Sequence, residues 1–227
     1  KENGTSPYPI LGALVNNRVE SLEYNIFRPK TIQFFDITHR QGWRIYQNSL
    51  CFLLYKATRD IYPQSQLTIC HSMTNGFYCT IRNTENGQIP DQLEMAQKIR
   101  ERMHELQISD LPFSRKSMLL EDAITAFENN NVPGTLRLLK GLSQLYVSVQ
   151  SLDGTIHKTA SQLAPTTGCL HCWDFYPYEE GYILQCPDRK NPSLLSLRQE
   201  TPKLFNVFQE HKKWVKLLGS DTIPSLN

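Results

Sequence analysis

Two thiols and an imidazole lie close together in the segment Cys169-Leu170-His171-Cys172. Thiolate and imidazole are ligands that Zn²⁺ prefers, but a structural zinc site needs four of them, usually from two separated clusters. The chain has no second C-x-x-C and no H-x-x-x-H. If this segment is a strand, Cys169 and His171 face one side and Cys172 faces the other. We therefore expect structural thiols here and no metal.

A cysteine–histidine pair for nucleophilic catalysis is a second candidate. Cys70 and Cys79 flank His71, but adjacency in sequence does not create a thiolate–imidazole pair, and residues in a hairpin alternate faces. We expect no such nucleophile. The remaining histidines stand alone and are predicted to be surface or hydrogen-bonded residues: His39, His104, His157 and His211.

Two aromatic segments could contact a partner. The run from Trp173 to Tyr178 could stack on bases, although a core strand followed by a turn is the preferred interpretation. Trp214 lies among lysines in a predicted C-terminal helix. It is either an interface anchor or part of intramolecular packing, and the sequence leaves both open.

The composition is that of an ordinary soluble globular protein. Of 227 residues, 40% are hydrophobic and 20% are charged, so one large or two small domains are expected. The net charge of +2 provides no strong electrostatic argument for a nucleic-acid binder. The six cysteines are expected to be reduced, because a chain of this length does not need disulfides.

The chain has no apolar run near the roughly 20 residues that a membrane helix needs. Its polar start, Lys1 to Pro9, does not resemble a signal peptide. We expect a cytoplasmic location and no membrane partner. Because the chain lacks an initiator Met, we interpret it as a fragment.

Strands are expected first, then a helix. The segments Ile10–Val15 and Thr31–Ile37 alternate like strands, with Asn16-Asn17 as a hairpin turn. Gly42 is expected to mark a break. Apolar residues at helical spacing then predict a helix from Arg44 to about Tyr62, ended by Pro63.

Later segments alternate between strands and helices in separate groups, which predicts an α+β fold. Two strands are expected over residues 66 to 82, joined near Asn75-Gly76, and strand-like patterning returns over residues 144 to 186. The expected helices follow Pro90 (with apolar Leu93, Met95, Ala96, Ile99, Met103 and Leu106), span about Leu119 to Asn130, start at Pro133, and span about Pro202 to Leu218.

In order and spacing, residues 10 to 186 resemble the N-terminal half of threonyl-tRNA synthetases. Residues 13 to 37 resemble the back half of the ubiquitin-like TGS domain, and Leu67 to Tyr78 resemble the I-G-P-x-I-x-x-G-F-Y-Y of that family. The resemblance implies a partial TGS-like domain at 10–40 after a flexible or truncated end at 1–9. It implies an editing-domain-like helix and antiparallel sheet fold at 41–190, and a C-terminal helix and linker at 191–227.

The same resemblance implies that the editing chemistry has been lost. In that family an H-x-x-x-H helix and a C-x-x-x-H segment form an editing or metal site, and here the four positions hold Asn48, Phe52, Thr159 and Leu163. A metal needs converging soft or basic ligands, which these residues do not supply. The pocket is either a filled relic or a ligand site in which Asn48 and Thr159 form hydrogen bonds. With these four residues we group His71 and Tyr78 as candidate ligand-binding residues, and we expect no catalytic residue.

The departures from the synthetase pattern are similar to a group of bacterial uridine (nucleoside) kinases. There the resemblance implies a downstream P-loop kinase domain that uses ATP and Mg²⁺. No G-x-x-x-x-G-K-[ST] occurs in this chain, so the fragment is expected to need no cofactor and to phosphorylate nothing alone. We predict a non-catalytic accessory region of such a kinase, with the kinase domain and a nucleoside, amino acid or tRNA as partners. The alternatives are a trans-acting editing hydrolase for mischarged tRNA built around His71, Asn48 and Thr159, a tRNA-binding module, or a dimerisation domain.

Overall fold

The computed structural model describes residues 6–73, 75–82, 91–129, 133–158, 161–198 and 210. The chain divides into two compact units, Lys1–Leu195 and Ser196–Asn227, and the fold described below is that of the first. The helix predicted over about 202 to 218 lies outside the described residues, apart from the single helical position Glu210.

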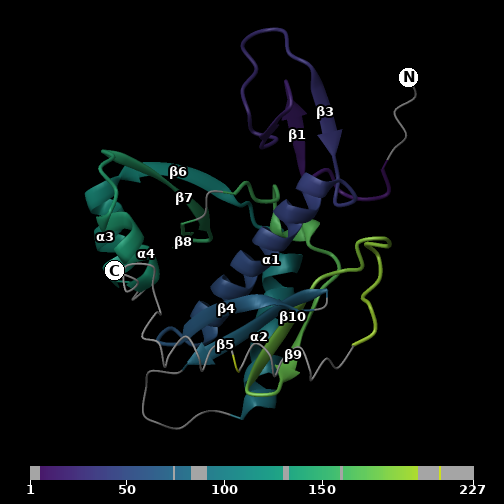
Figure 1. Ribbon diagram of the computed structural model, residues 1–227, viewed down its shortest axis with the longest axis vertical. Coiled ribbons are helices and arrows are strands. Elements are labelled where there is room, and N and C mark those ends of the chain that lie inside the picture. Colours follow the sequence, from purple (N-terminus) through teal and green to yellow (C-terminus); the bar gives the residue numbers. More distant parts are fainter. Residues whose placement is uncertain are drawn as a thin grey trace. The chain divides into compact units, whose positions relative to one another are not determined.

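The first unit begins with a small antiparallel sheet, shown in purple in Figure 1. It has the order β2-β1-β3, with β1 at Gly12–Val15, β2 at Arg18–Glu20 and β3 at Ile32–Phe35. Asn16 and Asn17 have φ values of 48° and 64°, as a tight hairpin turn requires. The predicted strands and turn are therefore confirmed.

Helix α1, Arg40–Ile61, follows directly. It begins at His39, whose side chain accepts a hydrogen bond from the Gln41 N–H, and it ends before Pro63 as predicted. The expected break at Gly42 is wrong, because this residue lies inside the first turn. A Cβ there would lie 1.8 Å from the Asp36 carbonyl oxygen, so Gly42 permits the helix to approach the preceding turn closely.

The central sheet is antiparallel with the order β4-β5-β10-β9. Its strands are β4 at Gln66–Met73, β5 at Gly76–Arg82, β9 at Asp174–Tyr178 and β10 at Gly181–Gln185. The predicted hairpin near Asn75-Gly76 is confirmed. Helix α2, Gln92–Ile108, packs beside α1 and this sheet (Figure 1). Five of the six apolar residues named for this helix are buried, and Leu93 is 62% exposed.

A third sheet has the order β6-β7-β8, with β6 at Ser114–Leu119, β7 at Tyr146–Leu152 and β8 at Thr155–His157. Helices α3, Leu120–Asn129, and α4, Pro133–Lys140, lie in the connection between β6 and β7. They form a small core of their own with this sheet, which includes Phe127, Leu139 and Val149. Helices and antiparallel sheets in separate groups make the protein α+β, as predicted.

One large hydrophobic core holds the rest of the unit together. It combines Leu11 and Phe35 of the N-terminal sheet with Leu53 of α1, Ile99 of α2 and Leu184 of β10. Residues on both sides of our predicted boundary at residue 40 thus share one core, and the boundary itself stays a prediction. No helix in the described part of the chain is both long and apolar enough to cross a membrane.

Candidate functional site

A polar groove of about 620 Å³ lies beside the N-terminal half of α1. Asn48, Arg44 and Gln41 line it from the helix, and Ser161 and Gln162 line it from the segment after β8. Residues 41, 44 and 48 lie on one face because their spacing follows the helical repeat. The groove is therefore formed by the two segments that the sequence singled out, α1 and the run around Thr159 to Leu163.

One helical turn further along, Phe52 does not line the groove. Its side chain is 1% exposed. Its ring centroid lies 5.3 Å from that of His157, 5.8 Å from that of Phe113 and 6.3 Å from that of Tyr55. These separations are typical of packed aromatic pairs. Phe52 is therefore a core residue and not part of the groove lining.

A buried hydroxyl on α1 holds the opposite wall in place. Ser49 Oγ accepts a hydrogen bond of 2.7 Å from the Ala164 N–H and donates one of 2.8 Å to the Ile45 carbonyl. Ser49 has no exposed surface. Because a buried N–H without an acceptor is costly, this bond fixes the segment beside Asn48 on the helix.

The structure describes Leu163 but not Thr159. Leu163 is only 7% exposed and belongs to the main core. It also lines a smaller hollow of about 280 Å³ together with Gln150 and Gln162. Thr159 lies outside the described residues, so its predicted hydrogen-bonding role stays a prediction.

His71 and Tyr78 pair with each other across β4 and β5, away from the groove. They are direct register partners just after a bulge between Ile69 and His71, and their rings stack at 5.3 Å. Phe77 lines the groove, and successive residues of a strand point to opposite faces, so Tyr78 points to the other face of the sheet. Burial raises the pKa of Tyr78 to about 12, which keeps its hydroxyl protonated at neutral pH. The structure therefore does not place this pair with Asn48.

The Cys169–Cys172 segment is not a strand. A short 3-10 helix, Thr167–Cys169, leads into an irregular bend. Cys169, His171 and Cys172 all line one cavity, so our expectation that they alternate between two faces is wrong. Among the described residues, no group of three or more His, Cys, Asp or Glu side chains could hold a metal ion.

The electrostatics of the groove suit binding and not bond cleavage. Among the described residues that line it, none is Cys, His, Asp or Glu, and Arg44 is the charged one. Ser161 supplies a hydroxyl, but a serine nucleophile needs an adjacent general base, and none of the described lining residues is a carboxylate or an imidazole. Amides and a guanidinium instead recognise hydroxyl, carbonyl and phosphate oxygens.

Of the nine described residues that line this groove, sequence reasoning singled out Asn48 alone. Gln41 and Arg44 could have been found, because they precede Asn48 by seven and four positions on a predicted helix. Ser161 and Gln162 carry no such signal. They lie at the groove because the Ser49 hydrogen bond and core packing of Leu163 bring their segment onto α1.

The chain is similar to threonine–tRNA ligases from several bacteria. It is 26% identical to the protein from Clostridium kluyveri over 159 residues, which is 70% of this chain and 24% of the relative. It is 26% identical to the protein from Rubrobacter xylanophilus over 182 residues, 80% of this chain and 27% of the relative. The ligase from Methylococcus capsulatus is 29% identical over 119 residues, 52% of this chain and 18% of the relative. No protein-family model matches the chain.

The matched region spans about a quarter of the length of the first two relatives. This similarity supports a tRNA-synthetase-related accessory or editing-like module, as the TGS and editing-domain resemblance implied. It gives no support to the kinase part of our prediction.

Proposed function

We propose that the chain is a synthetase-related accessory module whose groove beside Asn48 binds the end of a tRNA without hydrolysing it. The observation that carries this proposal is the lining of the groove, which combines Asn48, Gln162 and Arg44 with no Cys, His, Asp or Glu among its described residues. The relatives are named for ligation of threonine to tRNA, so an aminoacyl or nucleotide end is the ligand class that the resemblance favours.

The chemistry of the groove agrees with such a ligand. The Arg44 guanidinium presents donors in a fixed planar arrangement that matches phosphate oxygens. The amides of Asn48 and Gln162 can each donate and accept hydrogen bonds, as ribose hydroxyls and base edges require. Phe77 supplies an aromatic surface at the same groove, on which a base can stack.

The test is binding of unfractionated bacterial tRNA, followed by fluorescence anisotropy at fixed salt. Replacement of Arg44 by Ala is expected to weaken binding about three- to tenfold, since one charge-assisted phosphate contact is lost. The matched control is Arg137→Ala, because Arg137 is an exposed arginine of α4 that does not line the groove. Equal losses in both variants would indicate non-specific charge attraction, and absence of binding by the unaltered chain would refute the proposal.

The trans-acting hydrolase is the second candidate, because the relatives are tRNA ligases. It would need a rearranged site that uses His71, Asn48 and Thr159, and His71 stacks on Tyr78 instead of lining the groove. A panel of aminoacyl-tRNAs incubated with the folded chain tests it. Deacylation above the spontaneous rate, lost on Asn48→Ala, would replace the binding proposal with hydrolysis.

The nucleoside-kinase context stays a prediction that none of the comparisons supports. It concerns residues beyond this chain, and the parent gene tests it directly. A G-x-x-x-x-G-K-[ST] motif after a strand pattern, within a few tens of residues past Asn227, would establish an ATP- and Mg²⁺-dependent kinase domain downstream. Synthetase motifs in that position would exclude it.

A further inference from the structure

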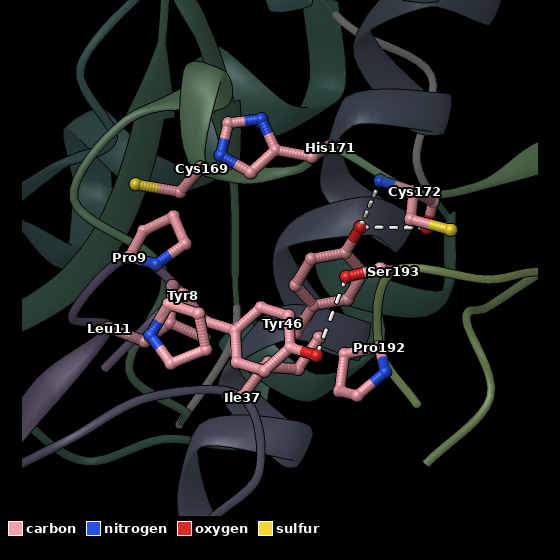
Figure 2. Close-up of a pocket in the computed structure, with 11 residues that line it drawn as sticks. Tyr8, Pro9, Leu11, Ile37, Tyr46, Cys169, His171, Cys172, Pro192 and Ser193 are labelled. Atoms are coloured by element: carbon pink, nitrogen blue, oxygen red, sulfur yellow. Dashed lines mark hydrogen bonds between the residues drawn. The ribbon is translucent and has the colours of Figure 1, made fainter. Parts of the chain in front are cut away.

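A second cavity, of about 510 Å³, lies apart from the groove and shares no lining residue with it. Figure 2 shows its walls, which come from four segments distant in sequence. Tyr8 and Pro9 precede β1, Tyr46 lies on α1, His171 follows the 3-10 helix, and Pro192 lies beyond β10. The residue types alone did not predict a site here, because only the fold brings these segments together.

Hydrogen bonds hold the cavity in shape. The Tyr46 hydroxyl donates to the Cys172 carbonyl at 2.8 Å and accepts from the Cys172 N–H at 3.0 Å, so α1 fixes the bend that carries His171. Ser193 Oγ donates to the Tyr8 hydroxyl at 3.4 Å, which joins the two outer walls. Figure 2 shows both tyrosine hydroxyls directed at these partners. The cavity is therefore largely pre-formed, and ligand binding requires little ordering of the chain.

The described lining contains no carboxylate, ammonium or guanidinium group. None of its 11 described residues is Asp, Glu, Lys or Arg. Burial raises the pKa of the Cys172 thiol above its ordinary value, so this group is a neutral thiol at pH 7. A charged ligand would lose hydration without gaining a carboxylate, ammonium or guanidinium partner. The two sites therefore differ in charge, because the groove contains the guanidinium of Arg44 and the described lining of the cavity contains none.

The shape and chemistry of the walls favour a planar ligand. Tyr8, Pro9 and Pro192 provide rigid ring faces, and Leu11 and Ile37 add an apolar surface. Because the Tyr8 oxygen accepts its bond from Ser193, its own proton can be donated to a ligand. The His171 ring, at the other end of the cavity in Figure 2, adds a second polar contact. The volume lies within the roughly 300–1,000 Å³ of small-molecule sites.

We propose that this cavity is a binding site for an uncharged, planar aromatic or heteroaromatic small molecule, which stacks on Tyr8 and accepts a hydrogen bond from its hydroxyl. The site is distinct from the groove that carries the proposed function. Either proposal can fail while the other holds.

The first experiment compares a neutral probe with its anionic counterpart on the full chain. Coumarin and coumarin-3-carboxylate share a planar ring and a carbonyl acceptor and differ by one negative charge. Titration followed by saturation-transfer difference NMR is expected to give a Kd of about 1 mM for coumarin. The carboxylate is expected to bind at least about tenfold more weakly. Equal affinities, or no binding of coumarin, would overturn the proposal.

Variants then locate the bound probe. Tyr8→Ala is expected to weaken coumarin binding at least about fivefold, because the stacking face and the donor are both lost. Ser193→Trp, at an exposed position on the rim, is expected to abolish binding by filling the cavity. Tyr146→Ala removes a 58% exposed tyrosine elsewhere and is the matched control.

Two further measurements distinguish loss of this site from loss of folding and from an effect of the groove. Thermal unfolding by circular dichroism verifies that each variant is folded, and if Tyr8→Ala is not, Ser193→Trp and the charge comparison decide. Arg44→Ala is expected to leave coumarin affinity unchanged, whatever its effect on tRNA. Loss of coumarin binding in Arg44→Ala or Tyr146→Ala, or its persistence in folded Ser193→Trp, would place the probe elsewhere and refute the proposal.

Discussion

Asn48 and Phe52 lie one turn apart on α1, yet their surroundings are opposite. Asn48 borders an open polar groove, whereas Phe52 is 1% exposed among the rings of Tyr55, Phe113 and His157. The comparison teaches that two neighbouring positions on one helix can have two structural outcomes. At one position the space is filled and adds to the core, and at the other it stays available to a ligand.

The largest expected effect comes from the filled position. Phe52→Ala removes a buried ring and leaves a cavity, so the free energy of unfolding is expected to fall by about 3–5 kcal/mol. Urea denaturation measures the change. Phe27→Ala, at a side chain that is 90% exposed, is expected to change stability by less than about 0.5 kcal/mol. Similar losses in the two variants would contradict the assignment of Phe52 to the core.

The next effect concerns the bond that holds the groove wall. Ser49→Ala leaves the Ala164 N–H without its 2.7 Å acceptor in a buried environment, at an expected cost of about 1–3 kcal/mol. Thr125→Ala is a suitable control, because this exposed hydroxyl donates only within its own helix, to Glu121. Hydrogen exchange should show faster exchange of the Ala164 amide in the Ser49 variant. An unchanged rate would mean that other contacts fix the segment.

The packing around Phe52 also predicts a pH dependence. Burial lowers the pKa of His157 below its ordinary value of about 6.5, and its Nδ1 has no hydrogen-bond partner within the described part of the chain. The folded state thus binds the proton less well than the unfolded state. Stability is therefore at its full value above about pH 6.5 and is lost as the pH falls through the folded-state pKa.

Denaturation at a series of pH values from 7.5 to 5 measures this loss. His157→Phe is expected to reduce the slope over that interval, since the titrating group is gone. The exposed His171 provides the matched control, and His171→Gln is expected to retain the slope. A slope that survives in the His157 variant would assign the pH dependence to other groups.

The smallest effect on stability is expected at the open position. Asn48→Ala is expected to change the free energy of unfolding by less than about 0.5 kcal/mol, because its side chain borders a groove and not the core. The same variant is expected to weaken tRNA binding about threefold through the loss of one hydrogen bond. Anisotropy titration measures the binding. A large loss of stability with unchanged binding would reverse the roles of positions 48 and 52.

Local signals predicted most of the elements. Apolar spacing and Pro63 located α1 within a few residues, and Asn16-Asn17 and Asn75-Gly76 located two hairpins, because turns and helix ends depend on nearby residues. Gly42 was misread, since a glycine that breaks a helix and one that permits close packing look alike in sequence.

The sequence likewise identified some features of the candidate site and missed others. Helical periodicity and a family resemblance were sufficient to single out Asn48 and Phe52. They could not separate His71 and Tyr78 from the groove, because the strand alternation that turns Tyr78 away depends on which face of β5 packs against α1. Nor could they show that Cys169 and Cys172 line one cavity, because that depends on a bend and not on a strand.

By itself, the sequence determined the α+β class and the order of the elements. Each of these follows from residue types and short-range spacing. Only the tertiary structure decided that position 48 is open and position 52 is filled. It also brought Tyr8, Tyr46 and His171 around one cavity whose described lining has no Asp, Glu, Lys or Arg. The reason is physical: whether a space exists depends on the packing of segments more than a hundred residues apart, and no local pattern encodes that packing.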